Sequence, residues 1–536
     1  GAATLDNNPA LQFVNDIALN ADLTIAGNNN LTINGVISGA GSLIKNGLAD
    51  LALSASNTFT GAVDILSGSV TLLNANALAG SSGTNVAAGA ALNLGVDSSL
   101  AGLSGTGGVA VGGGFNLSVG GLSTSSTFDG SLSGPGGLIK VGTGTLNLTG
   151  INGITGNTAI NAGTLNLTGS LGSAVVDVNN GGTLTGSGSL LGDVNINNGG
   201  HLALGSGATL SAGSLTMNAG ANMDVALGAP SLTSLLNVGG NVNLAGNLNV
   251  SDAGGFGAGV YRLINYTGSL GGSLNVSSVP VGYGLGDLLV QTSVGNQVNL
   301  VVSAPNIRFW DGSNNVANGS VDGGSGTWTA GGTNWTSADG ILNQTWGGGF
   351  AVFQGAAGTV SVDGAQTITG LQFVTDGYSL VNGTGGQLNT GSGNFAVRVD
   401  PLATATIGVD VTGAGVLNKL DTGTLVLNGA NTYTGGSLLN GGTLVVGSNT
   451  ALGTGTLTAA AGTTLDSNAP VTLGNDAVLN GALTVGGSNA LALNGAISGI
   501  GGLVKNGGAS LTLGGNNTYL GSTALNAGGL ILAANT

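Results

Sequence analysis

The side chains that most often carry out catalysis are scarce in this chain. It has no Cys, its acidic residues are all Asp, and its one histidine is His201. Zinc sites and nucleophile–base triads draw on His, Cys and Glu, so we predict no catalytic residue, metal site or cofactor. We interpret His201 as a corner or surface residue. The remaining candidate cluster is Asp311, Asp322 and Asp339 near Arg308, because polysaccharide-cleaving enzymes use paired carboxylates or Asp-bound Ca²⁺ with Arg.

The aromatic residues offer a second kind of chemistry, the stacking of indole rings on sugars. All four tryptophans fall in one segment and are Trp310, Trp328, Trp335 and Trp346. They could stack on carbohydrate, or they could form a local hydrophobic core where the cross-section of the fold changes. The segment follows Ala304-Pro305, a dipeptide typical of a boundary. We therefore predict that residues 306–353 form a Trp-rich joint.

The elements that must position these residues are short strands joined by tight turns. Gly accounts for 108 of 536 residues and charged residues for only 5%, a composition that is poor for helices. Hydrophobic residues account for 41% and recur at every second position, as at Leu511 and Leu513, which predicts a packed core rather than disorder. The formal net charge of −15, with seven basic residues, excludes nucleic acid as a partner.

Four copies of one repeat are marked by the four lysines of the chain. Each lysine ends the pattern Gly-x-Gly-x-Leu-x-Lys, with two leucines six and eight residues later and an asparagine twelve residues later. The repeat lysines and asparagines are Lys45, Lys140, Lys419, Lys505, Asn57, Asn152, Asn431 and Asn517. Short strands cannot bury themselves alone, so this pattern predicts a β-solenoid whose coils of roughly 20 residues stack on one another.

The lysines raise a question of burial. Leu43 and Lys45 have the same parity in a strand, so a continuous strand would direct both side chains inward. A lone buried ammonium group is costly. We therefore predict that the strand ends at each lysine and that all four amines lie in solvent at equivalent corners. Replacing Lys419 should then cost under about 0.5 kcal/mol.

The repeat resembles the passenger-associated transport repeat of bacterial autotransporters, also described as the autotransporter-associated β-strand repeat. The similarity rests on the Gly-x-Gly-x-Leu-x-Lys pattern and on Asn-Thr-Tyr-Thr-Gly at 431–435. Residues 261–302 are similar to stretches near the end of autotransporter β-helix modules. The resemblance implies a passenger domain of type V secretion and an all-β fold, a right-handed parallel β-helix. It also implies export across the outer membrane to the bacterial cell surface.

The same resemblance implies an outer-membrane export barrel on the same polypeptide but outside this chain, and it specifies no binding partner. The further partners that we consider are cell-surface or matrix glycans or proteins, and other copies of the chain through end-to-end self-association. We predict β-helix blocks with two repeat copies each at residues 1–305 and 354–536, on either side of the joint at 306–353.

These expectations lead to one leading hypothesis and two alternatives. The leading hypothesis is a secreted, surface-displayed structural and adhesive passenger that forms a rigid stalk for cell–cell, matrix or host contact. The alternatives are a self-assembling extracellular filament subunit and a polysaccharide-active β-helix enzyme. Residues 13–61 align with residues 473–521, and neither terminus shows a capping sequence. We therefore expect the native polypeptide to continue past Thr536, or its ends to stack on other copies.

Overall fold

The computed structural model describes residues 3–231, 233–302 and 306–533 of the chain. In that part the one helical element is a 3-10 turn, η1 (Leu285–Asp287), and no helix is long and apolar enough to cross a membrane. Nearly all strand pairs are parallel, and each strand pairs with strands about one coil away in sequence. The predicted all-β parallel solenoid is confirmed. The proposed boundary at Ala304-Pro305 lies outside the described residues.

The chain forms two compact units, each with its own stack of coils. Unit 1 comprises residues 1–228, 234–256 and 263–285, and unit 2 comprises residues 229–233, 257–262 and 286–536. The Trp-rich segment at 306–353 is thus part of unit 2. The division into two blocks and a separate joint stays a prediction.

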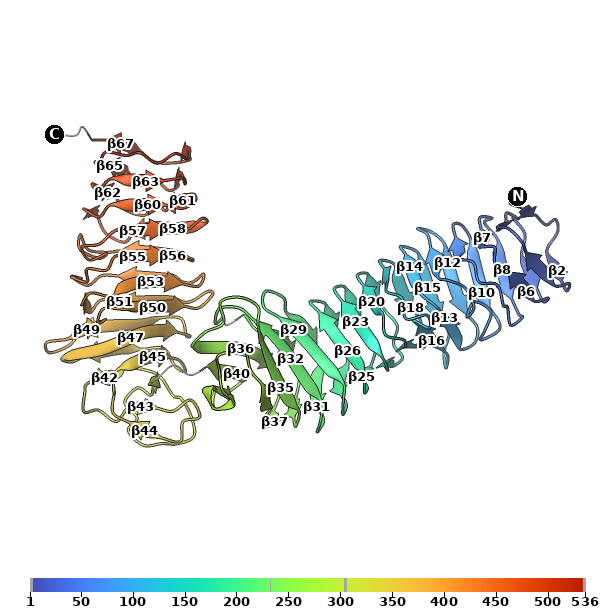
Figure 1. Ribbon diagram of the computed structural model, residues 1–536, viewed down its shortest axis with the longest axis horizontal. Helices are drawn as coiled ribbons and strands as arrows, with labels where there is room; N and C mark the ends of the chain where they lie inside the picture. The colour runs from blue at the N-terminus through green and yellow to red at the C-terminus, as the bar shows by residue number, and fades with distance from the viewer. Residues whose placement is uncertain (1–2, 232, 303–305, 534–536) are drawn as a thin grey trace. The chain divides into compact units, whose positions relative to one another are not determined.

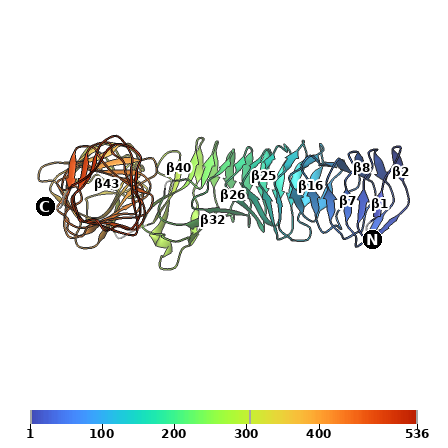
Figure 2. The same cartoon turned by 90° about the horizontal axis from the view of Figure 1, so that it is seen from above.

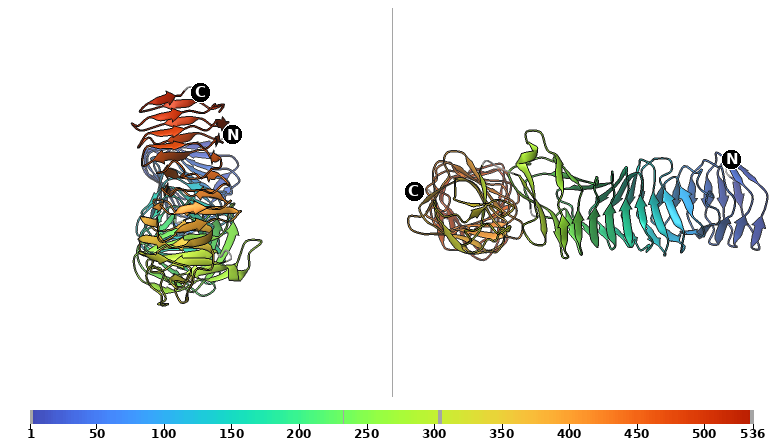
Figure 3. Two further views of the ribbon diagram at one scale, coloured as in Figure 1. Left: turned by 90° about the vertical axis from the view of Figure 1, so that its left-hand side faces the viewer. Right: turned by 90° about the horizontal axis from the view of Figure 1, so that it is seen from below.

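Unit 1 is built from parallel sheets that run along its stack of coils (Figures 1 and 3). The 14-stranded sheet contains β1 (Ala3–Leu5), β4 (Leu23–Ile25), β7 (Leu43–Lys45), β9 (Val63–Ile65), β11 (Thr84–Val86), β14 (Leu103–Gly105), β17 (Ser126–Phe128), β20 (Thr145–Leu148), β23 (Gly163–Leu167), β26 (Gly182–Gly186), β29 (His201–Gly205), β32 (Asn222–Leu227), β35 (Asn247–Asp252) and β38 (Asn275–Ser278). The nine-stranded sheet contains β13 (Ser98–Leu100), β16 (Asn116–Val119), β19 (Gly137–Lys140), β22 (Thr158–Ile160), β25 (Val175–Val178), β28 (Asp193–Ile196), β31 (Ser214–Met217), β34 (Val242–Leu244) and β37 (Leu270–Gly272).

Shorter ladders complete the coils of unit 1. The seven-stranded sheet contains β2 (Leu11–Phe13), β5 (Leu31–Ile33), β8 (Asp50–Leu53), β10 (Ser69–Leu72), β12 (Ala91–Leu94), β15 (Gly108–Val111) and β18 (Ser131–Ser133). The remaining strands are β3 (Ile17–Leu19), β6 (Ile37–Gly39), β21 (Ile151–Asn152), β24 (Ser170–Leu171), β27 (Ser189–Leu190), β30 (Leu210–Ala212), β33 (Leu236–Val238) and β36 (Gly259–Tyr266), whose first four residues belong to unit 2.

Unit 2 repeats the same construction, and Figure 2 shows its coils along their axis as a ring of strands and turns. The 13-stranded sheet contains β41 (Ile307–Trp310), β43 (Trp335–Thr336), β44 (Asn343–Gln344), β45 (Gly349–Phe353), β47 (Ala365–Phe373), β49 (Gln387–Asn389), β50 (Asn394–Val399), β52 (Asp410–Thr412), β53 (Val416–Leu420), β55 (Ser437–Leu439), β57 (Leu457–Ala459), β60 (Ala477–Leu479) and β63 (Ile497–Gly499).

Two more parallel sheets and one antiparallel pair belong to unit 2. The ten-stranded sheet contains β42 (Gly326–Trp328), β46 (Thr359–Val362), β48 (Tyr378–Asn382), β51 (Thr404–Ile407), β54 (Thr424–Leu427), β56 (Thr443–Val446), β58 (Thr463–Ser467), β61 (Leu483–Val485), β64 (Leu503–Lys505) and β66 (Thr523–Leu525). The others are β59 (Val471–Leu473), β62 (Leu491–Leu493), β65 (Leu511–Leu513) and β67 (Leu530–Leu532), and the antiparallel β39 (Leu288–Gln291) and β40 (Gln297–Val302).

The strand register confirms a coil of about 20 residues. Leu23 of β4 pairs with Leu43 of β7, which pairs with Val63 of β9. Along each strand, buried side chains alternate with partly exposed ones, because successive side chains of a strand point to opposite faces of the sheet. Like residues therefore stack on like residues from coil to coil, and the inward rows of Leu, Ile and Val form a continuous core.

The inward leucines should carry the stability of each coil. Leu427 of β54 is fully buried between Ile407 and Val446 of the neighbouring coils. Replacing Leu427 with Ala should cost about 3 kcal/mol of unfolding free energy, since it leaves a cavity in a packed row. The matched control is Val426→Ala, on the outward face of the same strand, with an expected cost under about 1 kcal/mol. Urea denaturation and amide hydrogen exchange at β54 measure both costs, and a reversed order would refute the facing assignment.

Candidate functional site

The four repeat lysines lie inside the coils, so the prediction that their amines lie in solvent is wrong. Lys45, Lys140, Lys419 and Lys505 are each at most 1% exposed. Each occupies an inward position at or near the end of its strand, in a row that carries aliphatic residues on the neighbouring coils. Lys45, for example, pairs with Ile25 on one side and Ile65 on the other. The aliphatic stem of the lysine thus replaces an apolar side chain in the core.

Backbone carbonyl groups at the corner of the coil surround each ammonium group. Lys140 Nζ donates hydrogen bonds to the carbonyl oxygens of Val141 at 2.7 Å, Gly142 at 2.8 Å and Ala162 at 3.1 Å. An ammonium group has three donors, so these three acceptors satisfy it completely. The same three-acceptor arrangement occurs at Lys419 with Leu420, Asp421 and Gly441, and at Lys505 with Asn506, Gly507 and Ala527. Lys45 donates to two such carbonyl groups, those of Gly47 and Ser67.

The turn after each lysine explains why the carbonyl groups reach the amine. In three copies the residue two positions after the lysine has a positive φ, at 68° for Gly142, 64° for Asp421 and 71° for Gly507. That residue's own carbonyl accepts from the lysine. The ammonium group is therefore buried together with its hydrogen-bond acceptors, which the turn supplies. The free-energy cost of burying an unpaired ammonium group does not apply to it.

The stability of the coil around Lys419 should depend on pH. Burial lowers the pKa of Lys419 from 10.5 to about 8, against the opposing effect of Asp421 and Asp400. The folded state therefore binds this proton less tightly than the unfolded chain does. The unfolding free energy should rise by about 1 kcal/mol as pH increases from about 8 to about 9.5, below the range of ordinary tyrosine ionisation. Urea unfolding across this range measures the rise, and the Lys419→Met variant is the control that lacks the contribution of Lys419 while keeping those of Lys45 and Lys140, whose pKa values burial also lowers. If the unfolding free energy instead fell as pH rose, and the Lys419→Met variant did not show that fall, the predicted direction would be wrong.

Three of the repeat asparagines, Asn57, Asn152 and Asn431, connect three successive coils. Asn431 is 1% exposed, its Oδ1 accepts from the backbone N–H of Val411 at 2.8 Å, and its Nδ2 donates to the carbonyl of Ala451 at 2.7 Å. Asn57 bridges Ile37 and Ala77 in the same way, at 2.8 and 3.0 Å. The Oδ1 atoms of Asn152 and Asn517 likewise accept from the preceding coil, at 3.0 and 2.9 Å. One amide thus satisfies backbone groups of the coils on both sides.

The four tryptophans form a single buried aromatic cluster in unit 2. Trp310, Trp328 and Trp335 are fully buried and Trp346 is 6% exposed. Their rings contact one another at centroid distances of 4.5–5.1 Å, mostly edge to face. Short antiparallel pairings of β41 with β43 and of β43 with β44 position Trp310 and Trp335, and the parallel pairing of β42 with β46 positions Trp328. With their faces covered by one another, the rings fit the interpretation of a local core and not that of a surface for sugar stacking.

Fluorescence tests the burial of this cluster. The intact chain should emit well to the blue of free tryptophan and should be quenched little by acrylamide, because all four indole rings are shielded from solvent. Unfolding in guanidinium should shift the emission to the red and expose the rings to the quencher. Equal quenching of the folded and unfolded chain would show that the rings are accessible.

The candidate carboxylates hold loops in place. Asp311 is buried, and its Oδ1 accepts from the backbone N–H of Asp322 at 2.8 Å while its Oδ2 accepts from Asn343 at 3.0 Å. Burial raises the pKa of Asp311, and these hydrogen bonds partly oppose the rise. Asp322 accepts from Asn314 and Asn318, and Asp339 from Ser337. Among the residues that the structure describes, no group of three or more His, Cys, Asp or Glu could hold a metal ion.

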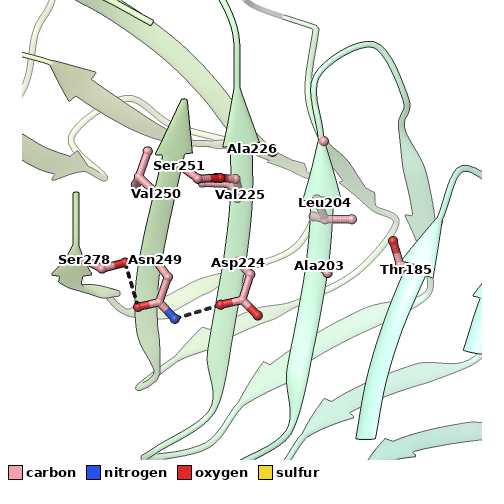
Figure 4. Close-up of a pocket in the computed structure, with 11 residues that line it drawn as sticks. Thr185, Ala203, Leu204, Asp224, Val225, Ala226, Asn249, Val250, Ser251 and Ser278 are labelled. Atoms are coloured by element: carbon pink, nitrogen blue, oxygen red, sulfur yellow. Dashed lines mark hydrogen bonds between the residues drawn. The ribbon is translucent and has the colours of Figure 1, made fainter. Parts of the chain in front are cut away.

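His201 lies at the surface beside an open groove that the sequence did not indicate. Its Nδ1 is 2.6 Å from Oδ2 of Asp224, and Asn249 donates to Oδ1 of the same carboxylate at 2.7 Å. Ser278 in turn donates to Asn249 (Figure 4). The groove encloses about 500 Å³ on the outward face of β26, β29, β32 and β35. It is lined by Thr185, Ala203, Leu204, Gly205, Asp224, Val225, Ala226, Asn249, Val250, Ser251 and Ser278.

Comparison with known proteins places the repeats in a family. The model of the family described as passenger-associated transport repeat matches residues 43–90, 138–167, 417–446 and 503–532, and each match begins two residues before a repeat lysine. The chain is also 43% identical over 265 residues to the adhesin BmaC autotransporter of Brucella suis biovar 1 (strain 1330). That alignment covers 45% of this chain and 8% of the relative. The four matches show that this β-solenoid is built on passenger-associated transport repeats, and the alignment shows that part of the chain is similar to an autotransporter adhesin.

Proposed function

We propose that the chain is part of a surface-displayed adhesive passenger, carried out of the cell by an outer-membrane export barrel on the same polypeptide. The observation that carries this proposal is the 43% identity to a protein named as an adhesin autotransporter. Because the chain spans only 8% of that relative, the adhesive role of this segment is an inference from part of the molecule. The repeat matches support the same route of export to the cell surface.

The construction of the two units supports a structural role in adhesion. Each unit closes its apolar rows inside the coils and directs short polar side chains outward, with Asn and Asp linking consecutive coils. Such a stack is stabilised by contacts between neighbours at every coil. It can therefore present a long lateral surface to a partner without a separate binding domain.

We also propose that the chain acts without catalysis. The candidate carboxylates Asp311 and Asp322 are engaged in hydrogen bonds that shape their own loops, and Arg308 donates to the carbonyl of Ile307 at 3.0 Å. Incubation with a panel of polysaccharides should therefore give no cleavage. Turnover of any polysaccharide that is lost on replacing Asp311 or Asp322 with Asn would overturn this part of the proposal.

A bead assay tests adhesion directly. Beads coated with the 536-residue chain should adhere to animal cells or to matrix-coated surfaces better than beads coated with an unrelated protein of similar acidic charge. The charge-matched control removes the contribution of non-specific electrostatics. Equal retention of the two kinds of bead on every surface would contradict an adhesive role.

A further inference from the structure

The outward face of the long sheet of unit 1 contains a notch in its rows of side chains. Thr185, Ala203, Asp224 and Asn249 pair in this order across β26, β29, β32 and β35. Because adjacent strands lie about 4.8 Å apart, the small side chain of Ala203 leaves a gap of roughly 10 Å between Thr185 and Asp224. The next outward row is also small, with Gly205 and Ala226 beside the groove. The notch has a floor of C–H groups and a rim of hydroxyl, amide and carboxylate groups.

The rim is held in place before any ligand arrives. Asp224 is fixed by His201 on one oxygen and by Asn249 on the other, and Asn249 is contacted by Ser278. The pairing of β35 with β38 shifts register at Asn249, and irregularities of this kind are frequent beside binding sites. A volume of about 500 Å³ is within the range of small-molecule sites. The groove is therefore a preorganised polar rim around an apolar floor.

The charge of unit 1 restricts the ligand. Its lysines are Lys45 and Lys140, and both are buried, so no Lys or Arg side chain reaches solvent in the described part of unit 1. A sulfated glycan, a nucleic acid or a phospholipid headgroup would meet Asp224 with no Lys or Arg side chain to balance its own charge, and the one histidine of the groove's rim, His201, is already paired with Asp224. A cationic peptide would find both oxygens of Asp224 already bonded. These conditions favour an uncharged ligand.

We propose that this groove binds a neutral glycan, an inference that rests on the proposed adhesive function and names its ligand class. A pyranose ring has an apolar C–H face and a rim of hydroxyl groups that both donate and accept hydrogen bonds. The floor at Ala203, Gly205 and Ala226 matches the first. Thr185 matches the second, together with the acceptor and donor capacity that Asn249 and Ser251 keep beyond their bonds to Asp224, Ser278 and Val225. The backbone groups below are used in strand pairing, so side chains make the polar contacts.

Two substitutions test the groove without disturbing the coil. Gly205→Val fills the notch, because a Cβ atom at Gly205 meets no other atom within 4 Å. Thr185→Val removes one rim hydroxyl and keeps the shape of the side chain. The matched control is Gly474→Val, in unit 2, where a Cβ atom also meets nothing within 4 Å. Circular dichroism and thermal unfolding should be the same for all three variants and the parent chain.

Saturation-transfer NMR on the 536-residue chain provides the readout. The probes are short linear oligosaccharides of glucose, mannose, galactose or N-acetylglucosamine, compared with a heparin-derived oligosaccharide and an oligolysine peptide. At least one neutral oligosaccharide should bind the parent and the Gly474→Val variant. Binding should be lost in Gly205→Val and weakened about 3- to 10-fold in Thr185→Val, the equivalent of one hydrogen bond.

The proposal is overturned if no neutral oligosaccharide binds, if Gly205→Val binds as well as the parent, or if only the charged probes compete for the groove. The bead assay separates this outcome from failure of the proposed function. If beads coated with the parent chain and beads coated with the Gly205→Val chain adhere equally, the groove is not the glycan site, and the adhesive function still stands. Beads that do not adhere at all would count against adhesion itself.

Discussion

Replacing Lys140 with alanine should lower the unfolding free energy of its coil by about 5 kcal/mol or more. Two losses add up: the aliphatic stem leaves a cavity in the row between Val119 and Ile160, which costs about 2–5 kcal/mol. In addition, the carbonyl groups of Val141, Gly142 and Ala162 lose their donor, at about 1–3 kcal/mol for each group that stays buried. The same reasoning predicts a large cost for replacing Lys419 with alanine, where the sequence alone led us to expect a small one.

Two further variants separate these contributions. Lys140→Met keeps most of the stem and removes the donor. Its unfolding free energy should therefore lie between that of the parent chain and that of Lys140→Ala. Ile139→Ala, on the outward face of the same strand, should cost under about 1 kcal/mol. Urea unfolding, with amide exchange at β19 to localise the effect, gives the values. If Lys140→Ala were no more costly than Ile139→Ala, the carbonyl cage would have no energetic role.

Replacing Asn431 with aspartate should cost about 4 kcal/mol at neutral pH. The change puts a carboxylate oxygen where Nδ2 donates to the carbonyl of Ala451, so a buried charge faces an acceptor. The new carboxyl should have a raised pKa in the folded state, because burial and the facing carbonyl both disfavour its ionised form. The folded chain then binds the proton more tightly than the unfolded chain, so stability should return as pH falls toward about 4.

The control for this prediction is Asn428→Asp, an exposed position three residues earlier, where the cost should stay under about 0.5 kcal/mol. Denaturation midpoints of both variants at neutral and acidic pH make the comparison. A penalty in the Asn431→Asp variant that does not diminish on acidification would show that the buried charge is not its cause.

The path of the chain could be predicted from its sequence, because the repeat and the period-two pattern both follow from local spacing. The alternation at Leu511 and Leu513 predicted the inward row, and the parity shared by Leu43 and Lys45 did place the lysine inward. The prediction that the amine lies in solvent was wrong because it assigned to that position the full free-energy cost of burying an isolated ammonium group. The acceptors are backbone carbonyl groups, one of them on the next coil. Every residue has such a group, so the residue types in a sequence do not show where the acceptors lie.

The groove could not be predicted for a related reason. Its residues are mostly Ala, Gly, Ser, Thr and Asn, with Leu, Val and one Asp, all of which occur throughout this chain, and they come from coils about 20 or more residues apart. Only the size of the side chains in three dimensions distinguishes Ala203 from its neighbours. The tryptophans were predictable as a group because they are close in sequence, but the packing of their rings against one another depends on antiparallel turns that no motif indicates.

The lysine cages bear on how such chains can change in evolution. The acceptor on the following coil is Ser67, Ala162, Gly441 or Ala527, so the identity of that residue does not matter. An ammonium group that bonds only to main-chain oxygen makes no demand on the identity of the residue that supplies the oxygen. Its stem needs only the aliphatic neighbours that the inward rows already provide. Gene duplication or recombination that moves one copy to another stretch of coils would therefore need few compensating mutations around the lysine.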